Sequence, residues 1–236
     1  YFELGQIEHA IESYKNAIKI NPECAEAYFH IGMLLKDKGE PEAAIEHYQK
    51  VIEIDPNSAA AYNNMGVVLR DIGKPDSAIK NLRQALIFDP NCAETYNNLG
   101  NSFSDKGNHE AAIKNYQQAI KISPDHADAF ANLGYSQRDS GDLNAAIKSY
   151  EKALDLNPDY IVSHFNMGMA LRDLGNQDGA IESYKRALHI DPNCAEAYNN
   201  IGNIYKDAGN LDSATENYQT AIKLDPLLFS AHNNLG

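Results

Sequence analysis

The chain has 236 residues, 43% of them hydrophobic and 22% charged, a composition that excludes collagen-like and highly charged disordered proteins. Its 33 acidic and 20 basic residues give a formal charge of -13, which argues against nucleic acid as a partner, because phosphate binding needs a lysine- and arginine-rich surface. No apolar run reaches the length of about 20 residues that a membrane-spanning helix needs. We therefore expect no membrane contact from this segment.

A repeat with a period of 34 residues runs through the whole sequence without an insertion. We therefore expect one domain, a single continuous array over residues 1–236. The prolines near the repeat boundaries are Pro22, Pro56, Pro90, Pro124, Pro158, Pro192 and Pro226. The glycines that share the period at a predicted turn are Gly5, Gly39, Gly73, Gly107, Gly141, Gly175 and Gly209.

Each repeat is predicted to form two helices joined by the turn glycine. In residues 59–73, apolar side chains recur at helical spacing and Gly73 is typical of a helix C-terminus. A second helix is predicted for residues 75–88, which ends before the boundary proline because proline lacks a backbone donor. Helix starts are marked by capping side chains or by proline in the first turn. These residues are Asn108, Asp142, Asn176 and Asn210, with Pro41 and Pro75 in two other repeats.

The apolar, glycine, alanine and proline positions of the repeat resemble the tetratricopeptide repeat (TPR). In the repeat from Pro192 to Pro226 the matching residues are Tyr198, Ile201, Gly202, Tyr205, Ala214, Tyr218, Ala221 and Pro226. The resemblance covers the whole chain and implies an all-α fold, a right-handed α-solenoid superhelix of seven helix-turn-helix repeats. It also implies that binding takes place on the concave wall of the superhelix.

A second glycine series lies inside the first helix of each repeat. Each of these glycines costs about 1 kcal/mol relative to alanine in a helix interior. A cost repeated in every unit is expected only where the missing Cβ lets a neighbouring helix approach closely. We therefore predict that Gly32, Gly66, Gly100, Gly134, Gly168, Gly202 and Gly236 are contact points between packed helices.

The opposite face of the first helix is polar and is not expected to be core. With the boundary proline numbered as position 32 of each repeat, this face consists of positions 2, 6, 9 and 13. Position 6 is asparagine in six consecutive repeats, and an asparagine amide matches the donor and the acceptor of a peptide unit. The candidate peptide-binding residues of this asparagine row are Asn64, Asn98, Asn132, Asn166, Asn200 and Asn234.

The asparagine row resembles the substrate-binding superhelix of O-linked N-acetylglucosamine transferases and of the related SPINDLY-type glycosyltransferases. The resemblance implies that the row holds the backbone of an extended peptide. The alternative is that asparagine at this position only suits solvated helix packing.

Position 13 is acidic in all seven repeats, although the dipole of the helix disfavours an anion in its last turn by about 0.3 to 1 kcal/mol. The carboxylates either accept hydrogen bonds from a bound chain or form ion pairs. Because side chains at i and i+1 diverge on a helix, we favour pairs with the adjacent repeat over pairs with the preceding cation. The candidate binding residues of this aspartate row are Asp71, Asp105, Asp139 and Asp173, and Glu3, Asp37 and Asp207 complete it.

No catalytic or cofactor chemistry is evident. The sequence has no zinc-ligand spacing, phosphate-binding loop or nucleophile elbow, so we expect no enzyme activity, no catalytic residue, no cofactor and no metal. The lysine and arginine positions of a carboxylate clamp for chaperone C-termini are also unfilled. The three cysteines, Cys24, Cys92 and Cys194, are too far apart for a disulfide framework and favour a cytoplasmic setting.

Two functions stay open. The first is a protein–protein interaction scaffold that binds extended peptides in its concave groove, such as the substrate-recruiting region of a larger glycosyltransferase. The second is a self-assembling subunit, because Tyr1 and Gly236 fall mid-helix in the repeat register and uncapped ends could stack head to tail into a filament. A window of a longer array would have the same ends. The expected partners are therefore proteins or peptides, including a second copy of the chain.

Overall fold

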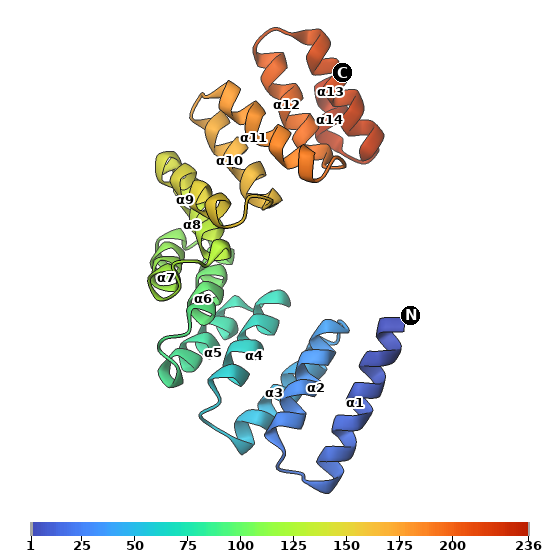
Figure 1. Cartoon of the computed structure of the whole chain (residues 1–236), viewed down its shortest axis with the longest axis vertical. Coiled ribbons are helices and arrows are strands. Elements are labelled where there is room, and N and C mark those ends of the chain that lie inside the picture. Colours follow the sequence, from blue (N-terminus) through green and yellow to red (C-terminus); the bar gives the residue numbers. More distant parts are fainter. Residues whose placement is uncertain (1, 236) are drawn as a thin grey trace. The chain divides into compact units, whose positions relative to one another are not determined.

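The computed structural model describes the backbone of residues 2–235 and the side chains of residues 7–235, and this range contains helices joined by short turns, with no strand. Its contacts divide it into two compact units, Tyr1–Pro124 and Asp125–Gly236. The first unit contains α1 (Phe2–Ile20), α2 (Ala25–Asp37), α3 (Pro41–Ile54), α4 (Ala59–Asp71), α5 (Pro75–Phe88), α6 (Ala93–Asp105) and α7 (His109–Ile122) (Figure 1). The second contains α8 (Ala127–Asp139), α9 (Leu143–Leu156), α10 (Ile161–Asp173), α11 (Gln177–Ile190), α12 (Ala195–Asp207), α13 (Leu211–Leu224) and α14 (Phe229–Leu235).

Both units are stacks of helix pairs, so the predicted all-α solenoid class is confirmed. Within each unit, every helix packs against its neighbours in the chain, and α4 also contacts α2 and α6 in the first unit. In the second unit, α8 contacts α10 and α12 contacts α14 in the same way. Over the described range, successive second helices make no comparable contact. The first helices of each unit therefore form the more closely spaced layer, and we call its exposed side the inner face.

The helix boundaries follow the sequence signals. Asn108 caps α7 by accepting a hydrogen bond from the Ala111 amide at 3.1 Å, and Asp142 caps α9 through the Ala145 amide at 3.0 Å. Proline is in the first turn of α3 and α5, as predicted. Six turn glycines, from Gly39 to Gly209, have positive φ angles of 71° to 90°. Residues other than glycine rarely adopt such angles.

The turn predicted at Gly5 is wrong, because α1 runs without a break from Phe2 to Ile20. Residues 2–4 continue into the same helix through Gly5. A glycine can then stay helical at a cost of about 1 kcal/mol. Tyr1, Gly236 and the side chain of Glu3 lie outside the described residues.

The glycines inside the first helices are contact points, as predicted. A Cβ added at Gly100 would lie 2.5 Å from Cε1 of Tyr116, and one at Gly202 would lie 2.6 Å from Cε1 of Tyr218. At Gly66 the neighbour is the side chain of Leu82, at 2.7 Å. The aromatic or leucine side chain of the second helix thus fills the space that glycine leaves on the first helix. The buried tyrosines of these pairs are Tyr48, Tyr116, Tyr150, Tyr184 and Tyr218.

The hydroxyls of these tyrosines are not equally satisfied. Tyr218 donates to Oδ1 of Asn203, at position 9 of its own repeat, over 2.9 Å. In the repeat of Tyr48, position 9 is Met33, and in the repeat of Tyr150 it is Tyr135. The buried hydroxyls of Tyr48 and Tyr150 have no hydrogen-bond partner among the described residues. Burial raises the pKa of Tyr48 to about 12. Asparagine at position 9 therefore stabilises a buried hydroxyl that other repeats leave unpaired.

We expect opposite effects when the hydroxyl is removed at Tyr150 and at Tyr218. Tyr218→Phe removes one of the two hydrogen bonds that Oδ1 of Asn203 accepts, the other coming from Asn234, and should lower the free energy of unfolding by about 1 kcal/mol. Tyr150→Phe removes an unpaired buried group, so stability should be unchanged or higher by up to about 1 kcal/mol. Urea denaturation of the two variants beside the parent protein measures the difference. Equal losses in both variants would contradict this account.

No helix within residues 2–235 combines the length and the apolar character needed to cross a bilayer.

Candidate functional site

The asparagine row lies on the inner face, but its members are not equally accessible. Asn98 is buried, with 7% of its surface exposed, whereas Asn64, Asn132, Asn166, Asn200 and Asn234 are half-buried. The uniform row that the sequence predicted is therefore corrected at Asn98.

Some of these amides link neighbouring repeats. Asn98 donates from Nδ2 to Oδ1 of Asn63 in the preceding repeat, over 3.2 Å. Asn234 donates to Oδ1 of Asn199 over 3.1 Å and to Oδ1 of Asn203 over 2.8 Å. Because adjacent first helices approach closely, an amide on one can reach an amide on the next. Position 6 thus contributes to repeat packing as well as to the exposed face, contrary to the expectation that it has no part in the core.

The aspartate row is exposed, and most of its described ion pairs are local. Arg70 contacts Asp71 at 2.9 Å, and the equivalent pairs Arg138–Asp139 and Arg172–Asp173 are 2.7 Å and 3.1 Å apart. One pair crosses to the adjacent repeat, from Arg70 to Asp105 at 3.8 Å. The preference for pairs between repeats is therefore wrong for most of the row.

The physical reason is the length of the arginine side chain. Although the Cβ atoms at i and i+1 diverge, the guanidinium can fold back across the last turn of the helix to reach the following carboxylate. This pairing offsets the unfavourable position of each carboxylate at its helix C-terminus.

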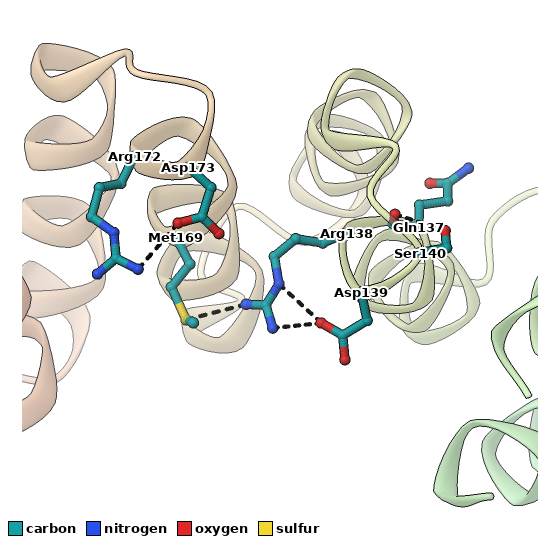
Figure 2. Close-up of polar contacts among 7 residues, drawn as sticks. All are labelled: Gln137, Arg138, Asp139, Ser140, Met169, Arg172 and Asp173. Atoms are coloured by element: carbon teal, nitrogen blue, oxygen red, sulfur yellow. Dashed lines mark hydrogen bonds and ion pairs between the residues drawn. The ribbon is translucent and has the colours of Figure 1, made fainter. Parts of the chain in front are cut away.

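Arg138 is the most buried of these arginines, with 13% of its side chain exposed. Figure 2 shows its guanidinium reaching from α8 towards Met169 of α10, with a nitrogen-to-sulfur distance of 3.3 Å, while Nε and a second nitrogen donate to Asp139. It also lies over the ring of Tyr135, 5.4 Å from the centroid. Burial disfavours its charge, but the hydrogen bonds to Asp139 and the attraction to its negative charge, with smaller contributions from Tyr150 and Tyr135, together raise the pKa of Arg138.

The inner face also carries exposed apolar side chains that the sequence reasoning missed. Tyr135 and Met33, both at position 9, are 40% and 39% exposed, and Val162, at position 2, is 53% exposed. These positions belong to the predicted polar face, where other repeats have asparagine or a carboxylate. Large apolar residues at positions 2 and 9 were the signal that could have revealed an apolar surface.

The described side chains offer little to a metal or to redox chemistry. No group of three histidine, cysteine, aspartate or glutamate side chains within residues 7–235 lies close enough to hold a metal ion. The three cysteines, Cys24, Cys92 and Cys194, are free and half-buried. Burial raises the pKa of the Cys194 thiol, which makes it a weaker nucleophile at neutral pH.

The sequence profile of a family described as TPR repeat matches seven overlapping stretches that cover the whole chain. The matched residues are 1–39, 32–73, 68–107, 100–141, 134–171, 168–208 and 202–236. The chain belongs to the TPR family. This agrees with the resemblance found in the sequence and with the stacked helix pairs of both units.

Several solved structures resemble this chain. The crystal structure of MamA protein has a TM-score of 0.63 and 32% identity, over 74% of this chain and 96% of MamA. YrrB, a TPR protein with an unusual peptide-binding site, has a TM-score of 0.65 and 25% identity, over 80% of this chain and 97% of YrrB. A chain of the APC/C hetero-tetramer Cut9-Hcn1 has a TM-score of 0.81 but 20% identity, so that likeness shows the fold alone. The match covers 99% of this chain but only 46% of the Cut9-Hcn1 chain.

Curated proteins gave no match. Proteins of the TPR family are typically non-catalytic scaffolds for protein interaction. The identification of this chain as a protein-interaction scaffold rests on that membership together with the fold.

Proposed function

We propose that the inner face of this TPR array binds extended peptide segments of partner proteins. The observation that carries the proposal is the row of asparagine amides, half-buried except for the buried Asn98, on the layer of first helices in each unit. An asparagine amide offers two donors and one acceptor, so it can hydrogen-bond to the backbone of a bound peptide whatever side chains that peptide carries. The TPR protein YrrB, 25% identical, is described as having a peptide-binding site, which supports this assignment.

The charge of the protein favours neutral or basic peptides. Its formal charge of -13 attracts cationic partners during association and repels acidic ones. Exposed carboxylates of the aspartate row, such as Asp71 and Asp105, are placed to accept hydrogen bonds from lysine or arginine of a bound chain. Because Arg70 already contacts both, we assign them a weaker role than the asparagines.

Selection from a library of random, unstructured, displayed peptides tests the proposal. We expect enrichment on the intact protein, and the affinities of selected peptides are then measured by fluorescence polarisation. Asn64→Ala combined with Asn166→Ala removes one amide from each unit, at about 0.5 to 1.5 kcal/mol per hydrogen bond. Binding should weaken by about tenfold, while the helical circular dichroism stays at the parental value. Unchanged affinity in the double variant, or no enrichment, would contradict the proposal.

The finer form of the proposal is that the array recruits substrates for a glycosyltransferase, which rests on the resemblance of the asparagine row. Transfer of a sugar to the selected peptides by the natural protein would support this finer form. Peptides that stay unmodified would contradict it. Head-to-tail assembly into a filament stays the alternative prediction. Light scattering of the natural protein over a range of concentrations separates the two, since a filament grows with concentration.

A further inference from the structure

The asparagine row contains two kinds of amide, and the preceding repeat decides which kind each one is. Asn98 is held by Asn63, at position 5 of the preceding repeat. Asn234 is held by Asn199 at position 5 and by Asn203 at position 9. A position-6 amide is therefore held in place where the preceding repeat supplies amide acceptors at these positions.

Three members of the row follow repeats that offer no such acceptor. Positions 5 and 9 of the preceding repeat are Phe29 and Met33 for Asn64, Ala131 and Tyr135 for Asn166, and Phe165 and Met169 for Asn200.

The structure agrees with this division. No side-chain hydrogen bond of Asn166 is present among the described residues, and Asn64 has only a long contact of 3.5 Å with its neighbour Asn63. Burial raises the pKa of Tyr184 to about 12, and the adjacent Asn200 slightly opposes that rise. Asn64 and Asn166 keep free donors on the inner face, and Asn200 has only a tyrosine hydroxyl beside it.

The available amides also lie next to apolar side chains. The bond from Asn234 to Asn203 shows that position 6 of one repeat lies in contact with position 9 of the repeat before it. From the same register we infer that Tyr135 is the neighbour of Asn166 and Met169 is the neighbour of Asn200. Tyr135 is 40% exposed and Met169 is half-buried. In the second unit, two consecutive repeats thus each present a backbone-binding amide beside an apolar side chain.

These two subsites carry little net charge. Arg138 lies between them, over the ring of Tyr135 and against the sulfur of Met169, but its charge is neutralised by Asp139. The side chains that fit here are apolar rather than acidic.

The distance between the subsites restricts the conformation of the ligand. Packed helices are about 8 to 10 Å apart. A polyproline II helix rises about 3.1 Å per residue with three residues per turn, so side chains at i and i+3 share a face about 9 Å apart. A β-strand places side chains of one face about 6.6 Å apart, which is too short. Polyproline II also leaves its backbone carbonyls unbonded, so they can accept from asparagine amides.

On the basis of the proposed function, we propose that Asp125–Gly236 binds a polyproline II segment whose apolar side chains, three residues apart, contact Tyr135 and Met169. Asn166 and Asn200 bond its backbone. Asn199, the immediate neighbour of Asn200, is a packing residue, with 7% of its surface exposed.

Two proline-rich peptides of identical composition test the spacing on the intact protein. One has leucines three residues apart and the other has them two residues apart. We expect the first peptide to bind about tenfold more tightly, which corresponds to a difference in binding free energy of roughly 1.4 kcal/mol. Asn166→Ala should remove most of this difference. Asn199→Ala is the matched control: Asn234 keeps its bond to Asn203, so peptide affinity should be unchanged while thermal stability falls.

The outcomes separate this inference from the proposed function. If library-selected peptides bind but the two isomers bind equally, the polyproline II assignment is overturned and peptide binding stands. If Asn199→Ala weakens binding as much as Asn166→Ala, without loss of helical signal, the division of the row into two kinds of amide is wrong. If neither isomer nor any library peptide binds, the proposed function fails, and this inference with it.

Discussion

Replacing Tyr184 by alanine is expected to lower the free energy of unfolding by about 3 to 5 kcal/mol. The side chain is fully buried, its ring lies 5.5 Å from that of Phe165, and it fills the space beside Gly168. Alanine would leave a cavity that two packed helices cannot close, because the second helix is fixed at both ends by its neighbours. Urea denaturation followed by circular dichroism measures the loss.

The loss should also be local. In a repeat protein each unit contacts only its neighbours, so amide hydrogen exchange should accelerate mainly in α10, α11 and α12. Leu174→Ala is the control, because Leu174 is 46% exposed and a surface change should stay within about 0.5 kcal/mol. A loss below 1 kcal/mol in the Tyr184 variant, or faster exchange spread evenly over all helices, would contradict the packing described above.

Gly100→Ala is expected to destabilise the first unit although alanine is the better helix former. The new Cβ would lie 2.5 Å and 2.7 Å from two ring carbons of Tyr116, which is 1% exposed and has no room to move. Overpacking of this kind costs about 1 to 3 kcal/mol, against a gain in helix propensity of about 1 kcal/mol. We therefore expect a net loss of up to about 2 kcal/mol in urea denaturation.

Gly107→Asn is the control for this variant. A Cβ at Gly107 meets no atom within 4 Å, and asparagine tolerates its positive φ of 71° better than other side chains do. Its stability should change by less than the Gly100→Ala variant. A stabilised Gly100→Ala protein would show that the close approach of α6 and α7 is not what glycine provides there.

The elements of the fold could be predicted almost completely because their signals are local and repeated. The predicted limits of the helix at residues 75–88 agree with α5, and the capping of α7 by Asn108 follows from one side chain and one turn. The close contact at Gly100 could be inferred because only packing explains a glycine at that point of every repeat. Gly5 is the exception, because it lies inside α1 rather than at a turn.

The candidate site was predicted in its location but not in its detail. The sequence alone determined that asparagines and aspartates recur on one face of each first helix, because helical periodicity fixes direction. Only the tertiary structure decided that Asn98 packs between repeats while Asn166 keeps its donors, and that Arg138 folds back onto Asp139. The physical reason is that a side-chain amide or guanidinium takes whichever partner is within reach. Which partner is within reach depends on the neighbouring helix and on the rotamer that the side chain adopts. Neither of these is encoded in the residue's own position in the repeat.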